Sequence, residues 1–255
     1  MEPVVSAHRQ IWRESGLSEG DRIVPEETAL ALSYDAGTYA VMMGTPQDLE
    51  DFAVGFSLTE GIIDNVTDIE SLDVVPQDEG IELRMWLAKR NAERLAQRRR
   101  HIAGPTGCGL CGIDSIVEAM KPVAIVGPGI HVTPQQVMAA MQALQPLQKL
   151  NTLTRAVHAA AFWQPDHGIT DIREDVGRHN ALDKLVGALA RKGIAASGGA
   201  VLLTSRVSVE MVQKTASMGA SIIVSVSAPT ALAIKMAERA GITDRKSTRL
   251  NSSHT

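Results

Sequence analysis

The only two cysteines of the chain, Cys108 and Cys111, lie three positions apart in the segment GPTGCGLCGID. Four glycines surround them, so we expect a flexible loop. Three kinds of site use thiols at this spacing: a redox dithiol, one half of a metal site and a sulfur relay. Since two cysteines cannot build a disulfide scaffold in a chain of 255 residues, the spacing indicates chemistry.

A metal site is the least favoured of the three interpretations. A structural zinc ion usually takes four thiolate or imidazole ligands, and the sequence offers no second ligand pair. With His158 as a third ligand the pattern would be similar to that of the zinc deaminases. However, Ala160 stands where those enzymes need a glutamate, and Gly107 stands where a proline precedes the first cysteine. We therefore expect no metal.

The surroundings of the cysteines favour a sulfur relay, in which one thiolate carries a sulfane sulfur and the second receives it or helps to release it. Such a relay needs an exposed, flexible segment and positive charge that stabilises the thiolate. Arg98–Arg100 and His101 lead into the cysteine segment, and Arg90 and Arg94 precede them. This basic run is either a solvated helix face or a positive collar, and a redox dithiol stays an alternative.

A second polar cluster is EDVGRHNALDK, residues 174–184, where a strand is expected to lead into a helix. Arg178 and His179 would lie in the first helical turn, whose free backbone N–H groups suit a phosphate or another anion. Asp175 would cap the same helix if the cluster were a buried capping network. The sequence leaves these two interpretations open.

A third cluster, with Ser205, Arg206 and Ser208, lies at another junction between a strand and a helix. Ligands of open α/β sheets bind at the carboxyl ends of the strands, where such junctions meet. One junction of this composition is a weak signal, and two are a stronger one. Together they indicate a ligand-binding edge.

Two strand pairs are expected in the first half of the chain. Residues 28–45 predict a hairpin with its turn at Asp35–Gly37, and residues 69–88 predict another with its turn at Asp78–Gly80. Both pairs alternate apolar and polar positions and carry turn-forming residues between them. The N-terminal portion is therefore rich in β-structure.

The pair Thr-Pro marks the expected start of two helices. Thr45 would cap a helix over residues 46–61, and Thr133 would cap a helix over residues 134–145. In each case the proline would occupy the first helical position. From residue 158 onward, strands alternate with helices up to Gly241, and the continuous apolar strands indicate a buried sheet. The fold class is therefore α/β.

Composition narrows the class of protein. The hydrophobic fraction of 44% and the charged fraction of 21% are ordinary for a soluble globular protein. A net charge of −4 and an aromatic fraction of 3% argue against a nucleic-acid binder. The sequence has no signal-peptide core and no apolar run long enough for a membrane span, so we expect no membrane partner and a cytoplasmic location.

Taken together, the clusters and elements resemble one family closely, the FdhD sulfur carrier proteins required for formate dehydrogenase activity. The resemblance runs in order from about Thr28 to Thr243. The segments that carry it are PQDLEDFAVGFSLTEGII, TGCGLCG, VHAAAF, EDVGRHNALDKLVG, GAVLLTSRVSVEMVQK and VSAPTALAIKMAERAGIT. The cysteine segment and EDVGRHNALDK are its specific motifs.

The resemblance implies a fold and a role. The fold is a mixed sheet flanked by helices, as in cytidine deaminases but without their zinc, with the β-rich N-terminal portion added. The role is that of a sulfurtransferase, which accepts persulfide sulfur from a cysteine desulfurase and passes it to the molybdenum cofactor. The sulfurated bis-guanine-dinucleotide form of that cofactor is needed by formate dehydrogenase. We also expect a homodimer.

The resemblance assigns site residues as well. Cys108 matches the cysteine that carries the persulfide, and Cys111 matches its loop partner. The expected cofactor-binding residues are His158, Arg178, His179, Asn180, Ser205 and Arg206. Two alternatives stay open: a non-catalytic chaperone that binds and delivers the cofactor, and a dithiol oxidoreductase.

The chain departs from the family at two places. Arg155 and Ala156 stand before His158, where small residues are usual. After Thr243, where another strand would be entered, the polar sequence DRKSTRLNSSHT is not expected to continue the fold or to supply the family's C-terminal cofactor loop. We therefore divide the chain into an N-terminal extension, 1–27, a family domain, 28–243, and a tail of foreign origin, 244–255.

Overall fold

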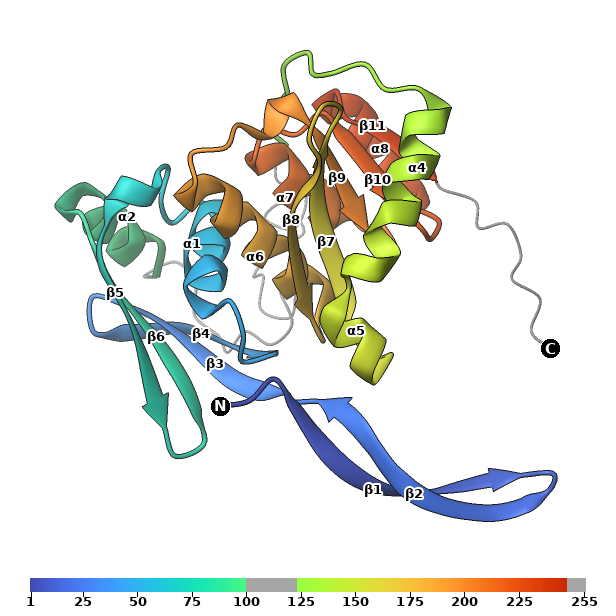
Figure 1. Cartoon of the computed structure of the whole chain (residues 1–255). Helices are drawn as coiled ribbons and strands as arrows, with labels where there is room; N and C mark the ends of the chain where they lie inside the picture. Colours follow the sequence, from blue (N-terminus) through green and yellow to red (C-terminus); the bar gives the residue numbers. More distant parts are fainter. Residues whose placement is uncertain (100–122, 247–255) are drawn as a thin grey trace.

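Two sheets enclose a pair of packed helices in the computed structural model, which describes residues 1–99 and 123–246 (Figure 1). A four-stranded sheet packs against α1 (Leu49–Thr59), and a five-stranded sheet packs against α6 (Arg178–Arg191). The two helices touch where Gly55 faces Gly187. The fold is therefore mixed α/β with sheets flanked by helices, as the sequence predicted.

The four-stranded sheet has the strand order β4-β3-β6-β5. Its strands are β3 (Thr28–Tyr34), β4 (Gly37–Gly44), β5 (Ile69–Gln77) and β6 (Gly80–Leu87). Both predicted hairpins are confirmed, since β3 pairs antiparallel with β4 and β5 with β6, while β3 and β6 run parallel. Asp35 and Ala36 have φ values of 49° and 63°, the left-handed turn that suits the twist of a tight hairpin.

The predicted start of α1 is wrong. The helix begins at Leu49 after Asp48, so Thr45 and Pro46 lie outside it. The backbone N–H of Thr45 donates to Asp175 Oδ2 at 3.0 Å, and Thr45 Oγ1 accepts from the N–H of Val176 at 3.1 Å. Contacts with a segment 130 and 131 residues away therefore hold Thr45, and the local Thr-Pro signal carries no information about them.

Helix α2 (Lys89–Arg99) forms where the basic run is. Arg90 Nη2 donates to Asp68 Oδ1 at 2.8 Å, and Arg94 Nη1 donates to Asp64 Oδ2 at 3.0 Å. These two arginines are thus paired with the acidic connection before β5. The side chains of Arg98–Arg100 lie outside the described residues, so the positive collar stays a prediction there.

The five-stranded sheet has the strand order β11-β10-β9-β7-β8. Its strands are β7 (His158–Gln164), β8 (Gly168–Asp175), β9 (Ala200–Leu203), β10 (Ile222–Ser225) and β11 (Thr243–Lys246). β9, β10 and β11 run parallel, and β7 runs antiparallel to both β8 and β9. β8 therefore points the same way as β9, and the carboxyl ends of these strands share one edge.

The expectation that no strand follows Thr243 is wrong. β11 pairs parallel with β10 over Thr243–Lys246, which crosses the expected domain boundary by three residues. The short strand forms because it lies along the exposed edge of β10, where backbone pairing is available to almost any sequence. The foreign origin of residues 244–255 stays a prediction.

Helices cover both faces of the five-stranded sheet (Figure 1). α6, α7 (Val209–Ser217) and α8 (Ala231–Ala240) pack on one face, and α4 (Pro134–Leu144) packs on the other. The predicted cap of α4 is confirmed, since Thr133 Oγ1 accepts from Gln136 N at 3.2 Å. A short 3₁₀ turn, Gln145–Leu147, then leads into α5 (Lys149–Thr154).

The first residues form a two-stranded hairpin, β1 (Val4–Arg13) and β2 (Gly16–Pro25), which extends away from both sheets (Figure 1). Its base is tied to the second half, because Arg22 Nη2 donates to the carbonyl of Thr154 at 2.8 Å. Among the described residues, no helix has the length and apolar character that crossing a membrane requires.

Candidate functional site

The two predicted strand-to-helix junctions meet at one edge of the five-stranded sheet. His158, the first residue of β7, pairs with Asp175, the last residue of β8. Next to them, Leu203 at the end of β9 pairs with Ser225 at the end of β10. This sheet edge therefore gathers His158, the turn from β8 into α6 and the loop from β9 into α7. Both junctions therefore lie on the same edge of the sheet.

A buried ion pair anchors the turn from β8 into α6. Lys184 and Asp175 are both 0% exposed, and Lys184 Nζ lies 2.6 Å from Asp175 Oδ2. Lys184 Nζ also donates to the carbonyl of Thr45 at 2.9 Å. Asp175 Oδ1 accepts from the N–H of Gly177 at 2.7 Å and from Asn180 Nδ2 at 3.1 Å. The buried charges are thus paired and hydrogen-bonded, the condition under which burial is tolerated.

This network supports the interpretation of EDVGRHNALDK as a buried network, for the inner residues of the cluster. Asp175 accepts from Gly177, the N-cap residue itself, instead of from the first helical turn. Asn180 is 2% exposed, and its amide nitrogen also donates to the carbonyl of Met43 at 2.8 Å. The inner part of the cluster is therefore a buried network that fixes where α6 begins.

The outer part of the cluster has a different character. Arg178 and His179 are the first two residues of α6, and both are partly buried. Arg178 Nε and His179 Nε2 are shielded from solvent, yet neither has a hydrogen-bond partner among the described residues. Buried polar atoms of native proteins are nearly always paired, so these two are suited to a ligand. Gly177 gives α6 no side-chain cap, which leaves backbone donors of the first turn for the same ligand.

The start of α7 lies beside the start of α6. His179 Nε2 is 3.9 Å from Glu210 Oε2, in the first turn of α7. Ser208 is the N-cap of α7 and makes no side-chain cap hydrogen bond. Two helix N-termini thus converge at the sheet edge, and their dipoles favour negative charge there.

Both histidines of the site are held neutral. Burial, followed by the positive charges of Arg178 and Lys214, lowers the pKa of His179 to about 4, against the opposing effect of Glu210. Burial, followed by the charge of Arg178, also lowers the pKa of His158. At neutral pH each imidazole therefore has one nitrogen that donates and one that accepts a hydrogen bond.

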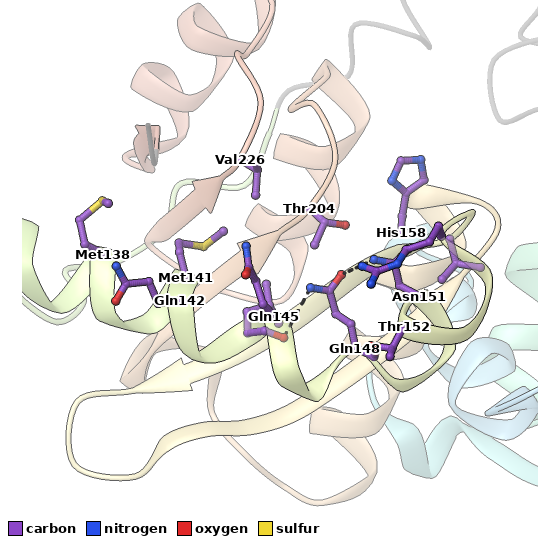
Figure 2. A pocket seen from close by; sticks show the side chains of 13 residues that line it. Met138, Met141, Gln142, Gln145, Gln148, Asn151, Thr152, His158, Thr204 and Val226 are labelled. Atoms are coloured by element: carbon purple, nitrogen blue, oxygen red, sulfur yellow. Dashed lines mark hydrogen bonds between the residues drawn. The ribbon is translucent and has the colours of Figure 1, made fainter. Parts of the chain in front are cut away.

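A pocket of about 540 Å³ opens beside His158. Figure 2 shows Met138, Met141 and Gln142 along α4, with Thr204 and Val226 at the strand ends opposite them. The pocket is lined by Met138, Met141, Gln142, Leu144, Gln145, Gln148, Asn151, Thr152, Arg155, Val157, His158, Thr204 and Val226. Eight of these residues are polar or charged and five are apolar, so the walls are mixed. The volume lies in the range of sites for small organic ligands.

Amide side chains are half of the polar residues that line the pocket: Gln142, Gln145, Gln148 and Asn151. Asn151 Nδ2 donates to Gln148 Oε1 at 3.4 Å, and Gln148 Nε2 lies 3.5 Å from the carbonyl of Leu144 (Figure 2). Both contacts are at the long limit of hydrogen bonds, so a better partner can displace them. Each amide carries donors and an acceptor, which suits the edge of a nucleobase.

The remaining predicted binding residues lie in the loop from β9 into α7. Ser205 is 4% exposed, and its hydroxyl donates to the carbonyl of Arg206 at 3.3 Å. Arg206 is exposed. The structure thus places His158, Arg178 and His179 around one site, Asn180 inside the network behind it, and Ser205 and Arg206 on the neighbouring loop.

The two predicted catalytic residues, Cys108 and Cys111, lie outside the described residues. Within residues 1–99 and 123–246, no group of three or more histidine, cysteine, aspartate and glutamate side chains is arranged to hold a metal ion.

Sequence reasoning missed the pocket wall formed by α4 and α5. A signal for it exists, because Gln142, Gln145 and Gln148 recur every three residues and so fall on one side of a helical segment. Polar residues at such spacing are usual on solvated helix faces, and nothing in the sequence indicates that the sheet edge lies opposite them.

Comparison with known proteins identifies the family. The model of the FdhD/NarQ family matches residues 25–249. A sulfur carrier protein FdhD from Agrobacterium fabrum is 52% identical over 238 residues, which cover 92% of this chain and 87% of that protein. A sulfur carrier protein FdhD from Cupriavidus necator is 47% identical over 232 residues, which cover 91% of this chain and 81% of that protein.

A solved structure shares the fold. The crystal structure of a candidate formate dehydrogenase accessory protein from Desulfotalea psychrophila has a TM-score of 0.74 and 24% identity, covering 96% of this chain and 93% of that one. The shared fold and the family match over nearly the whole chain lead to one conclusion: the chain belongs to the FdhD/NarQ family.

Proposed function

We propose that the protein is a sulfur carrier that works as a sulfurtransferase, passing persulfide sulfur to the molybdenum cofactor of formate dehydrogenase. The observation that carries the proposal is the identity of 52% to a sulfur carrier protein over 92% of the chain. Two features support it: the single close pair of thiols, and the nitrogens Arg178 Nε and His179 Nε2 at the sheet edge, which lack hydrogen-bond partners in the described residues.

Cys108 is the proposed sulfur carrier. Its thiolate attacks the terminal sulfur of a cysteine persulfide on a cysteine desulfurase. A new S–S bond forms, and the cysteine of the desulfurase leaves as a thiolate. The persulfide that results on Cys108 holds sulfur at the oxidation level of sulfane, ready for transfer.

Cys111 is the proposed releasing thiol. Its thiolate attacks Sγ of the Cys108 persulfide, the Cys108–Cys111 disulfide forms, and hydrosulfide leaves. The two cysteines lose two electrons in this step, and the departing sulfur gains them. A cellular dithiol reductant then restores both thiols before the next cycle.

The sheet edge is the proposed binding site for the cargo. The cargo carries two guanine nucleotides, whose phosphates are anions with many acceptor oxygens. Arg178, His179 and the uncapped starts of α6 and α7 offer donors to such groups, and His158 lines the pocket at the same sheet edge. Ser205 and Arg206 extend this surface along the neighbouring loop, and Asn180 holds α6 in place behind it.

The proposal also defines the partners. A cysteine desulfurase supplies sulfur and a formate dehydrogenase receives the sulfurated cofactor, so the protein works in the cytoplasm, where both thiols are kept reduced. We further propose that it acts as a homodimer, which would present one carrier segment for each copy of the chain.

Intact-mass spectrometry tests the carrier role. After incubation with a cysteine desulfurase and cysteine, the protein is expected to gain the mass of whole sulfur atoms and to lose it on treatment with a reductant. Cys108→Ala should abolish the gain. Cys111→Ala is the matched control: it should still take up sulfur and should retain it longer, because the releasing thiol is missing.

A folded protein that gains no sulfur would contradict the carrier role. In that case the pocket and the unpartnered donors would favour the alternative of a non-catalytic chaperone. A dithiol oxidoreductase would instead give a loss of two hydrogens on oxidation and no gain of sulfur.

A further inference from the structure

Lys214, on α7, is a buried cation that the proposed mechanism does not use. Its Nζ donates to both carboxylate oxygens of Asp183, on α6, at 2.8 and 2.9 Å, and the two side chains are 11% and 2% exposed. Nζ also donates to Thr59 Oγ1 at 3.0 Å, and this hydroxyl donates to Asp183 Oδ1 at 2.7 Å. One closed group of hydrogen bonds therefore joins α1, α6 and α7 (Figure 1).

The lysine stays charged in this position. Burial lowers its pKa, but the carboxylates of Asp183 and Glu60 outweigh burial and raise the pKa above its ordinary value. Nζ lies 3.9 Å from Glu60 Oε1 and 5.8 Å from the ring centre of Phe56, whose face attracts a cation. Lys214 therefore places a permanent positive charge between the three helices.

Two contacts connect α6 and α7 like the rungs of a ladder. His179 and Asp183 are four residues apart on α6, and residues at this spacing share one face of a helix. Glu210 and Lys214 are four residues apart on α7 in the same way. One contact is the ion pair of Lys214 with Asp183, and the other brings Glu210 Oε2 to 3.9 Å from His179 Nε2. Because the ion pair holds α7 against α6, it also fixes the place of Glu210 beside the imidazole.

The charge of Lys214 acts on the same imidazole. His179 faces Arg178 on its own helix, Glu210 and Lys214 on α7, and His158 on β7. Burial has the largest effect on the pKa of His179, and the charges of Arg178 and Lys214 follow, all three lowering it against Glu210. The rung that fixes the geometry therefore also supplies part of the electrostatic field at His179.

We propose that Lys214 is a positioning residue for the proposed cargo site: its pairing with Asp183 holds α7 against α6 and sets the charge that His179 faces. The lysine acts through His179 and not through contact with the cargo. The cargo then meets the same donors and the same charge throughout the neutral pH range, because His179 takes up no proton there. This inference rests on the proposed function in taking His179 as part of the cargo site, but the protonation of His179 is measured without cargo.

NMR titration of the imidazole C–H groups in the full-length protein tests the proposal, with the His179 resonance assigned by its loss in His179→Gln. Lys214→Met should raise the pKa of His179 by about 0.5 to 1 pH unit, because a nearby positive charge is lost. Lys214→Arg should leave it near the wild-type value, since arginine keeps the charge. Glu210→Gln should lower it, because the charge that opposes the shift is removed.

Three further variants separate the charge of Lys214 from the integrity of the fold. Lys192→Met removes a cation that pairs with the buried Asp171 at the other end of α6, and it should leave the pKa of His179 unchanged. Thr59→Val opens the hydrogen-bonded group but keeps the charge, so it should leave that pKa unchanged as well. Lys214→Met with Asp183→Asn leaves no unpaired buried charge, so the double variant should fold and still show the raised pKa.

The outcomes distinguish this inference from the proposed function. A pKa of His179 that is equal in the wild type, in Lys214→Met and in the double variant would overturn the role of Lys214. An equal rise in Lys192→Met or in Thr59→Val would also overturn it, because loosening of the fold would then be the cause. Failure of the proposed function would appear separately, as a wild-type protein that takes up no sulfur while its His179 still responds to Lys214.

Discussion

Arg178 and His179 differ from the residues beside them because each has a buried nitrogen without a hydrogen-bond partner in the described residues. Asp175, Asn180 and Lys184 satisfy one another and hold the carbonyls of Met43 and Thr45. Arg178 Nε and His179 Nε2 are shielded from solvent with no partner in the described residues. An unsatisfied buried group costs about 1 to 3 kcal/mol, so a ligand that pairs with these atoms recovers free energy.

His179 makes the stability of the protein sensitive to acid. Its pKa is about 4 in the folded state against an ordinary value of 6.5, so the unfolded state takes up a proton first as the pH falls. The contribution of His179 to the free energy of unfolding is fully present above its pKa in the unfolded state. This contribution is lost as the pH falls from there toward 4. Between about pH 7 and pH 4.5 the wild type should therefore lose roughly 2 to 3 kcal/mol through this group.

Urea unfolding of His179→Gln at both pH values measures that contribution. Glutamine keeps a polar side chain and removes the titration, so the variant should lose less stability on acidification than the wild type. If the variant and the wild type lost the same free energy of unfolding between the two pH values, the result would contradict the burial of a neutral imidazole at this position.

Sequence alone could predict that these polar residues form a cluster. It could not predict which of them form the buried network and which keep unpaired donors. The composition of EDVGRHNALDK indicates either an anion site or a capping network, and the structure contains a network with unpaired donors beside it. The deciding partners, Met43 and Thr45, are 137 and 139 residues away from Asn180 and Lys184. Local patterns carry no information about such contacts.

At the scale of elements, the crossing of α1 and α6 depends on two glycines. A Cβ on Gly187 would lie 1.8 Å from the carbonyl oxygen of Asp51, and a Cβ on Gly55 would lie 1.7 Å from that of Asp183. Both obstacles are backbone atoms, so a side chain at either position has to push the helices apart. The close approach also brings Asp51 within reach of Arg173, at 2.6 Å, across the two halves.

Gly187→Ala should therefore destabilise the protein by about 3 kcal/mol or more, since the shift disturbs both cores. Chemical denaturation of the purified variant measures the change. Gly20→Ala is the matched control, because its Cβ would have no atom within 4 Å, and it should stay within about 0.5 kcal/mol of the wild type. A tolerated Gly187→Ala would mean that the helices are not in contact there.

Strand β11 carries a partly buried aspartate, Asp244, at a position that would suit an apolar side chain better. Asp244 Oδ1 is shielded from solvent without a partner in the described residues, and burial raises the pKa of this carboxyl. The pKa of Asp244 is higher in the folded state than in the unfolded state. Its contribution to stability is therefore present below the pKa of the unfolded state and is lost as the pH rises through the pKa of the folded state. At neutral pH the carboxylate therefore weakens β11.

Asp244→Val should raise the melting temperature at about pH 7 and give a smaller gain near pH 4, because the raised pKa means that more of the carboxyl is protonated there. Thermal unfolding at the two pH values measures both gains. Equal gains at both values would show that the carboxylate is solvated and that burial has no part in the effect.

Elements with strong local signals were predictable, and elements shaped by distant partners were not. The hairpin turns and the start of α4 follow from turn-forming residues and a capping box, which act within a few residues. The start of α1 was wrong because tertiary contacts hold Thr45. The short 3₁₀ turn and α5, which bear the pocket amides, have no such local mark.

At the scale of the whole molecule, the sheet edge is where the two halves of the fold meet. The connection from β4 to α1 binds Asp175 and Lys184, and the segment from α4 to α5 closes the pocket from the other side. The proposed cargo site therefore depends on both halves being folded. The α/β class was predictable from the alternation of strands and helices, whereas the layer formed by α1 and α6 rests on contacts between distant segments.

A single-turnover transfer experiment tests the central claim most directly. The protein is loaded with sulfur by a cysteine desulfurase, freed of the desulfurase and of excess cysteine, and mixed with formate dehydrogenase that holds unsulfurated cofactor. Formate oxidation should appear in proportion to the persulfide added, and Cys108→Ala treated in the same way should give none. Equal activation by Cys108→Ala, or by protein that was never loaded, would contradict a sulfur carrier and indicate a chaperone.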